Sequence, residues 1–131
     1  MAPIRPVNFS ELFDKLRDRK VGKEVHTARG YDPRKDLYYK SLIGKDVPWQ
    51  IHNKMFFGRV RHTKVEYVWS DEVSESFISE DTYAFWGRDD WLRLMNKFYG
   101  QDRVFLIVVY GLWTEIVTNQ PVRKEQMKLE V

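Results

Sequence analysis

Three histidines and three pairs of adjacent carboxylates are the residues in this chain most able to perform chemistry. His52 and His62 stand ten positions apart, about 15 Å along a helix, which is too far for both to bind one metal ion. The acid pairs at 71–72, 80–81 and 89–90 lie in an expected loop or at expected helix starts, where carboxylates complement the helix dipole. Acid–base catalysis needs carboxyls with separated pKa values in one pocket, so we interpret these pairs as capping residues.

The sequence motifs of common catalytic and cofactor sites are absent. The chain has no cysteine, which excludes thiol catalysis, disulfides and cysteine-based metal sites. It contains no HExxH, no GxGxxG and no GxxxxGK[ST] segment, and a lone histidine such as His26 is more often a packed side chain than a ligand. The sequence therefore predicts no catalytic residue, no metal site, no cofactor and no enzymatic activity.

Lysines and arginines are concentrated in the first half of the chain. Residues 1–65 contain 15 Lys and Arg against 7 Asp and Glu, whereas residues 66–131 contain 7 against 12. Cations interleaved with tyrosines can neutralise phosphates while the rings stack on bases. The candidate contacts to a nucleic acid or an acidic partner are Arg17, Arg19, Lys20, Arg34, Lys35, Arg59, Arg61 and Lys64. The alternative is an ordinary solvated face, since acids are mixed among these cations.

Aromatic side chains are unusually abundant, with 5 Trp, 7 Tyr and 8 Phe in 131 residues. Adjacent aromatic residues on a helix point about 100° apart, so doublets such as Phe56-Phe57 tend to leave one ring near the surface. Exposed rings with charged neighbours are typical of interfaces. The candidate residues of a self-assembly interface are Trp49, Phe57, Glu72, Glu75, Glu80, Asp81 and Trp86. A wide core that exposes only tyrosine hydroxyls is the alternative.

Apolar spacing and capping residues predict helices along most of the chain. Phe9, Phe13 and Leu16 follow a helical period after Asn8, and Asp32-Pro33 is typical of a helix start. The expected helical blocks are 9–21, 33–43 together with 48–69, 90–99 and 102–118. Residues 70–82 are expected to form a solvated loop, and a short helix is expected over Tyr83, Phe85 and Trp86. Local alternation in 60–69 and the Val and Ile content of 102–118 leave strands possible there.

These elements predict an all-α protein, a helical bundle of about four main helices. A length of 131 residues and a mass of 15.8 kDa indicate one domain. We expect an extended arm at 1–7, a helical-bundle domain at 8–120 and a charged, frayed tail at 121–131. No signal peptide is recognisable. The apolar run that begins at Val104 is shorter than the roughly 18–20 residues of a membrane span, although contact with a membrane surface stays possible.

Several segments resemble the bicaudavirus coat family of archaeal viruses. They are Asn8-Phe9-Ser10-Glu11-Leu12-Phe13, Tyr38-Tyr39, Phe56-Phe57 and the apolar segment Val104–Val117. The resemblance implies a helical-bundle coat subunit that is present in many copies in a virion and performs no catalysis. It adds no individual functional residues.

Together these features predict a non-enzymatic structural protein that assembles with copies of itself, as a coat subunit of a virion does. In this hypothesis the basic first half of one copy contacts the acidic segment 66–90 of the next, and aromatic side chains exclude water from the contact. The alternative is a small basic DNA- or RNA-binding protein, and a coat could itself contact genomic DNA. If the resemblance does not hold, the expected location is the cytoplasm.

Overall fold

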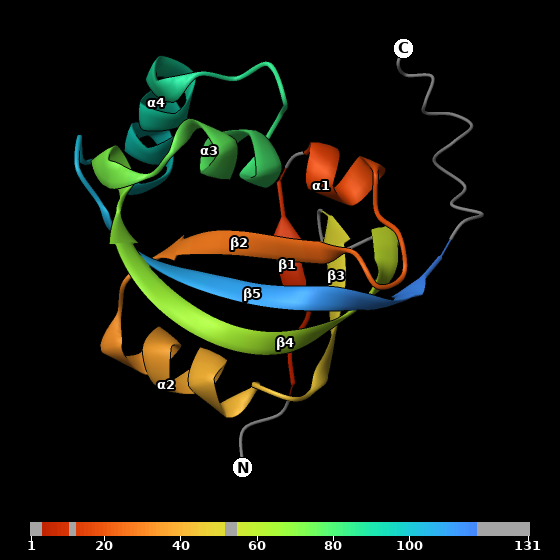
Figure 1. Cartoon of the computed structure of the whole chain (residues 1–131). Coiled ribbons are helices and arrows are strands. Elements are labelled where there is room, and N and C mark those ends of the chain that lie inside the picture. The colour runs from red at the N-terminus through yellow and green to blue at the C-terminus, as the bar shows by residue number, and fades with distance from the viewer. Residues whose placement is uncertain (1–3, 11–12, 52–54, 118–131) are drawn as a thin grey trace.

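A curled five-stranded sheet with helices at both of its ends forms the protein (Figure 1). The structure is a computed structural model, and it describes residues 4–10, 13–51 and 55–117. Its strands are β1 (Val7–Phe9), β2 (Glu24–Gly30), β3 (Asp46–Ile51), β4 (Met55–Trp69) and β5 (Phe105–Ile116). Its helices are α1 (Asp14–Arg17), α2 (Pro33–Ser41), the 3-10 turn η1 (Ser70–Glu72), α3 (Glu75–Asp81) and α4 (Arg88–Tyr99).

The strand order in the sheet is β1-β3-β4-β5-β2. β1 pairs with β3 in parallel, and the other three pairings are antiparallel. The edge strands β1 and β2 are linked by a side chain: Arg29 of β2 donates to the carbonyl oxygen of Asn8 at 3.2 Å and lies over the Phe9 ring. The curl thus brings the two edges of the sheet together, and Arg29 spans the seam between them.

A glycine permits the close contact at the centre of the sheet. Gly58 has a φ of +145° and sits where the pairing with β3 shifts register. A Cβ at this position would lie 2.0 Å from the carbonyl oxygen of Glu115 on β5. Glycine alone fits both the backbone angle and the close approach of the neighbouring strand.

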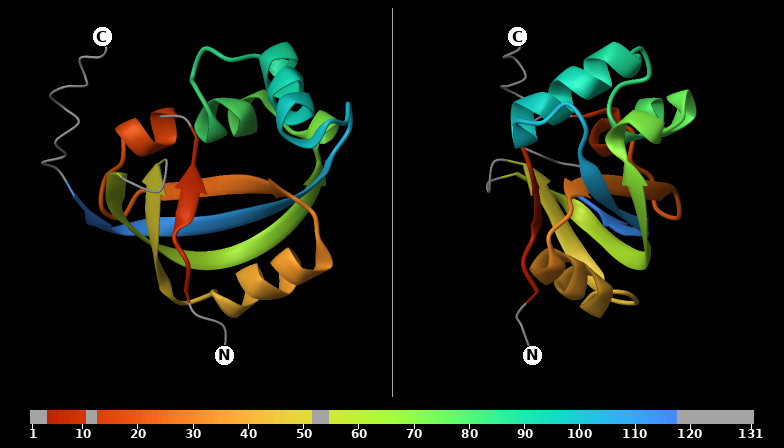
Figure 2. Two further views of the ribbon diagram at one scale, coloured as in Figure 1. Left: turned by 180° about the vertical axis from the view of Figure 1, so that it is seen from behind. Right: turned by 90° about the vertical axis from the view of Figure 1, so that its left-hand side faces the viewer.

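The helices divide between opposite ends of the curled sheet. α1, α3 and α4 lie over one end, and α2 lies over the other, as all the views of Figures 1 and 2 show. We call these ends the α3–α4 pole and the α2 pole. The first carries contacts of α3 with β2 and α1, whereas α2 contacts β4.

The all-α prediction is wrong, because two apolar segments expected to be helices are strands. Residues 102–118 contain β5, whose residues from Leu106 to Val109 are all buried. A strand buried on both faces loses the alternation of apolar and polar residues that identifies strands in a sequence. Residues 48–69 form β3 and β4 instead of a helix, so the alternation noted in 60–69 was the correct signal.

The helices with clear terminal signals were predicted well. α2 begins at Pro33, and the Asp32 side chain accepts hydrogen bonds from the backbone of Arg34 and Lys35. α4 ends at Gly100, which adopts the left-handed conformation with φ +69°. These local signals act through the nearest residues, so they do not depend on the rest of the fold.

Three other local predictions are wrong. The expected helix 9–21 is replaced by β1 and the short helix α1, although Phe9, Phe13 and Leu16 are all buried in the core. The expected loop 70–82 contains η1 and α3, and the expected helix over 83–86 is a turn. Strand β1 begins at Val7, at the end of the expected arm. Residues 1–3 of that arm and the expected tail at 121–131 lie outside the described residues.

Large aromatic side chains fill much of the core. Trp49, Trp91 and Trp113 are fully buried, and the Trp49 and Trp113 rings meet edge to face at 5.6 Å. Four rings are exposed among the described residues: Tyr31, Tyr67, Phe85 and Phe98. The fold therefore leaves these four of the described aromatic rings exposed and covers the others in part or in full. Within the described part of the chain, no helix is long and apolar enough to cross a membrane.

Candidate functional site

A buried ion pair lies beneath the helices of the α3–α4 pole. The Nζ atom of Lys15 is 2.8 Å from the Oδ1 atom of Asp81, and the two side chains are 4% and 8% exposed. Lys15 also donates to the carbonyl oxygen of His26 at 3.0 Å. Its ammonium lies 5.0 Å from the centre of the Phe9 ring and 5.6 Å from that of Phe13. The cation is thus held by one carboxylate, one carbonyl and two ring faces.

Contacts between α1 and the end of α3 hold the pair in place. The backbone N–H of Asp14 donates to the carbonyl oxygen of Thr82 at 2.8 Å, and the Asp14 side chain accepts from the backbone N–H of Ala84 at 2.9 Å. Leu16, next to Lys15, is fully buried. α1 is therefore held by two contacts of its first residue, Asp14, and by the buried Leu16 side chain, and these position the neighbouring Lys15.

His26 is the third member of the cluster. Its Nε2 atom lies 3.3 Å from Asp81 Oδ1 but has no hydrogen-bond partner, and its ring stacks on Phe77 at 4.3 Å. Burial lowers the pKa of His26 to about 4, although Asp81 opposes the shift. The pKa of Lys15 is also lowered by burial, again against the attraction of Asp81. His26 is therefore neutral at pH 7.

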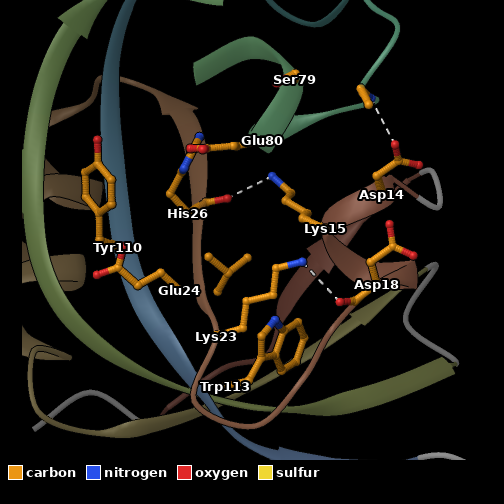
Figure 3. A pocket seen from close by; sticks show the side chains of 12 residues that line it. Asp14, Lys15, Asp18, Lys23, Glu24, His26, Ser79, Glu80, Tyr110 and Trp113 are labelled. Carbon is orange, nitrogen blue, oxygen red and sulfur yellow. Dashed lines mark hydrogen bonds between the residues drawn. The ribbon is translucent and has the colours of Figure 1, made fainter. Parts of the chain in front are cut away.

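Two cavities meet at this cluster, and Lys15 lines both. The larger, the α1 cavity, has a volume of about 480 Å³, and its wall includes Lys15, Asp18, Glu24, His26, Glu80 and Trp113. Figure 3 shows these side chains arranged around it. The smaller, the seam cavity, has a volume of about 220 Å³ and lies where Phe9 and Arg29 meet α4. Asp81 lines the seam cavity, and Lys15 lines both.

The geometry provides binding chemistry but no metal-ligand set. Within residues 4–10, 13–51 and 55–117, no group of three His, Asp or Glu side chains is placed to hold a metal ion. The α1 cavity combines charged side chains with the apolar residues Val25 and Trp113, and it is more polar than most small-molecule sites.

Most of the basic residues predicted to contact a nucleic acid are engaged within the chain. Arg19 donates to the carbonyl oxygens of Leu16, Phe57 and Val117. Arg17 pairs with Asp14, Arg59 with Glu115, Arg61 with Asp46 and Lys64 with Glu66.

Three predicted cations remain. Lys20, Arg34 and Lys35 have no side-chain partner among the described residues, and all three are exposed. Arg34 and Lys35 lie together on α2, whereas Lys20 follows α1. The structure therefore brings only two of the eight predicted contacts together as unpaired neighbours.

The predicted interface residues divide between core and surface. Trp49 and Phe57 are buried in the core, and Asp81 is buried against Lys15, so the folded subunit does not present these three at its surface. Glu72 is exposed and bonds to Arg103, and Glu75 lies 3.7 Å from Arg88. Glu80 is exposed and Trp86 is half-buried. Both are at the α3–α4 pole, where sequence reasoning overlooked the more exposed Phe85.

The Lys15–Asp81–His26 cluster was missed because its members are far apart in the sequence. Lys15 and Asp81 are separated by 66 positions, and no local signal shows that a charged residue will be buried. The one available hint was the position of Lys15 between the apolar residues Phe13 and Leu16. Comparison of the chain with known protein families, characterised proteins and solved structures finds no significant match.

Proposed function

We propose that this chain is a non-enzymatic structural protein that assembles with itself head to tail through its two poles. The observation that carries the proposal is that each pole has a largely exposed apolar side chain, with unpaired charges near it that are opposite in sign at the two poles. Leu37 on the α2 pole is 71% exposed, and Phe85 on the α3–α4 pole is 81% exposed. Because the poles lie at opposite ends of the molecule (Figure 2), a contact between them repeats in an open array.

The α2 pole offers a basic surface. α2 has no buried residue, and the exposed side chains of Arg34 and Lys35 lie within one turn of Leu37. Asp36 on the same helix is already paired with Lys40 at 3.1 Å. The two unpaired cations therefore set the sign of the charge around Leu37.

The α3–α4 pole offers an aromatic surface with acidic neighbours. Phe85 stacks on Tyr83 at 5.4 Å, and Tyr83 contacts Trp86 at 5.2 Å. Glu80 and Asp89 are exposed on either side of this segment in the chain and have no ion-pair partner among the described residues. A packed aromatic group with acids nearby complements a basic helix that exposes a leucine.

This arrangement retains the contact predicted from the sequence but with other anchors. The basic segment is α2, the acidic segment is 80–89, and the anchors are Leu37 and Phe85 in place of Trp49 and Phe57. The resemblance to viral coat proteins implied a helical bundle, and the curled sheet removes that support. A place in a virion accordingly stays a prediction, and self-assembly rests on the two poles.

Charge reversal at each pole tests the proposal. The double variants Arg34→Glu/Lys35→Glu and Glu80→Lys/Asp89→Lys should each stay monomeric at concentrations at which the natural chain associates, because like charges then meet in the contact. A mixture of the two variants should associate, since each reversed pole meets a complementary one. Sedimentation velocity at low and high salt measures this, and the association of the natural chain should weaken as salt screens the charges.

Two controls separate the contact from general effects of charge. Lys20→Glu/Lys64→Glu changes the net charge by the same amount as the α2 variant, but away from α2, and should associate normally. Phe85→Ala should weaken association, whereas Val21→Ala, at another exposed apolar residue, should not. A natural chain that sediments as a monomer at every salt and protein concentration contradicts the proposal, as does a mixture that fails to associate.

Binding of DNA or RNA has less support from the geometry. Five of the eight cations predicted for it are engaged by acceptors within the chain. The remaining pair on α2 is the same pair that the assembly contact uses. Nucleic-acid contact therefore stays a prediction. If α2 binds DNA or RNA, Arg34→Glu/Lys35→Glu should reduce the retardation of the nucleic acid in a gel-shift assay.

A further inference from the structure

The α1 cavity has the size of a ligand site. Its volume of about 480 Å³ lies within the range of about 300–1,000 Å³ that is usual for small-molecule sites. It opens between α1, the start of β2 and the end of α3, and its lining comes from segments far apart in the sequence (Figure 3). Of the residues assigned to the pole contact, only Glu80 also lines this cavity.

The charges on the cavity wall are predominantly negative. Asp18, Glu24 and Glu80 line it, and none of the three has an ion-pair partner among the described residues. The positive charge of Lys15 is compensated by Asp81 at 2.8 Å. Lys23 is the other cation on the wall, and its Nζ atom donates to the carbonyl oxygen of Asp18 at 3.3 Å. An excess of carboxylates favours a cationic ligand.

The remaining wall is apolar and aromatic. Val25 and Trp113 are buried side chains that line the cavity, and the half-buried Tyr110 ring adds a third surface. Ring faces attract organic cations, and the attraction strengthens when water is excluded. These residues suit a ligand that carries an apolar body as well as a charge.

A buried polar atom at the cavity lacks a partner. His26 lines the cavity and is 5% exposed, yet its Nε2 atom has no hydrogen-bond partner in the described structure. This nitrogen is closed to solvent and lies 3.3 Å from the Oδ1 atom of Asp81. His26 therefore contributes a neutral ring to the wall, since burial lowers its pKa to about 4, and it does not offer this nitrogen to a ligand in the cavity.

We propose that the α1 cavity binds a small organic cation, an ammonium group attached to an apolar or aromatic body. The ammonium group lies near the carboxylates of Asp18, Glu24 and Glu80. The apolar body packs on Val25 and Trp113. Lys15, held by Asp81, forms the floor and prevents a second cation from entering more deeply.

Three probes of one shape and different charge test the proposal. Tyramine is the cation, 4-ethylphenol is its neutral analogue, and 3-(4-hydroxyphenyl)propionate is the anion. Isothermal titration at pH 7 and low salt should show saturable binding of tyramine, at least about tenfold weaker binding of the neutral analogue, and no binding of the anion. Equal binding of the first two, or no saturable binding of tyramine, overturns the proposal.

Two variants locate the site. Asp18→Asn/Glu24→Gln should weaken tyramine binding by at least about tenfold, since it removes two carboxylates from the wall. Asp46→Asn/Glu115→Gln is the matched control, because it makes the same chemical changes at exposed acids outside the cavity and should bind tyramine normally. Normal binding by the cavity variant contradicts the assignment of the site.

His26→Phe separates binding from folding. It keeps a ring against Phe77 and removes the buried unpaired nitrogen, so the protein should be no less stable at pH 7. Because that nitrogen does not face the cavity, tyramine should bind to this variant as it binds to the natural chain, and a loss of binding would contradict the proposed position of the ammonium group. Neither cavity variant alters Leu37, Phe85 or their charged neighbours, so failure of this proposal and failure of the assembly contact are measured independently.

Discussion

The two poles of the sheet use charged residues in different ways. At the α3–α4 pole the Lys15–Asp81 pair is buried, with side chains 4% and 8% exposed, below helices that bury Ile78, Trp91 and Leu94. At the α2 pole the Lys40–Asp36 pair lies on a helix with no buried residue, and the Lys40 side chain is 52% exposed. The same two residue types are thus part of the core at one pole and of the surface at the other.

The difference shows where stability and recognition reside. A buried charge pair stabilises weakly as a pair, but either charge alone is strongly destabilising, so the α3–α4 pole tolerates little change beneath its surface. A solvent-exposed pair contributes little and can be replaced freely. α2 is therefore open to variation for contacts with other molecules, whereas the cluster at the α3–α4 pole constrains the fold.

Removal of the Asp81 charge should have the largest effect. Asp81→Asn leaves the Lys15 ammonium buried without its carboxylate, and we expect the free energy of unfolding to fall by about 3–5 kcal/mol. Urea denaturation followed by tryptophan fluorescence measures this. The equivalent change at the α2 pole, Asp36→Asn, should leave the urea midpoint nearly unchanged.

A double variant distinguishes a missing partner from a damaged helix. Lys15→Met/Asp81→Leu removes both charges and should recover most of the stability lost in Asp81→Asn, because apolar side chains of similar size replace a buried pair well. If the double variant is less stable than Asp81→Asn, the burial of an unpaired Lys15 is not the cause of the loss.

The two poles also differ in how well the sequence predicted them. α2 was predicted from Asp32 and Pro33, which act on the backbone within a few residues of themselves. The segment above the cluster was predicted as a loop, and Asp81 was placed on the surface, because its burial depends on Lys15 from a distant part of the chain. Helix capping by nearby residues can thus be predicted from a single sequence, whereas the burial of a charge pair cannot.

The strands show a second limit of sequence reasoning. In β5 the residues Ile107, Val108 and Val109 are buried without alternation, and such a run is equally compatible with a buried helix. In β4 the alternation was present in 60–69, but the helical spacing of Val65, Val68 and Trp69 was given more weight. α4, by contrast, keeps one buried face with Trp91, Leu94 and Met95 at helical spacing, and it was predicted correctly.

Acid should destabilise the protein through His26 and His62, which are both buried. Burial lowers the pKa of His26 and of His62 from 6.5 to about 4. Between pH 6.5 and 4 the unfolded chain therefore binds more protons than the folded one. The histidines leave the free energy of unfolding undiminished above pH 6.5 and lower it as the pH drops toward 4. Each histidine should contribute a slope of about 1.4 kcal/mol per pH unit within that window.

Variants assign the slope to the individual histidines. His26→Phe and His62→Gln should each flatten the dependence of unfolding free energy on pH between 6.5 and 4, and the effects should add because the side chains are in separate environments. His62 accepts a hydrogen bond from Trp49 at 3.2 Å, and glutamine can also accept it. If a single variant leaves the slope unchanged, the histidine it replaces has the same pKa in the folded and the unfolded protein.

The smallest effect is expected from Tyr67→Phe at the α2 pole. The Tyr67 hydroxyl donates to the Asp36 carboxylate, and this bond is the main cause of the lowered pKa of Asp36. Its loss should raise the rate of amide hydrogen exchange in Pro33–Ser41, because this bond links α2 to β4, and leave exchange in α4 unchanged. The urea midpoint should barely move. Faster exchange in α4 as well would mean that α2 opens together with the whole fold, and the two poles would then be one cooperative unit.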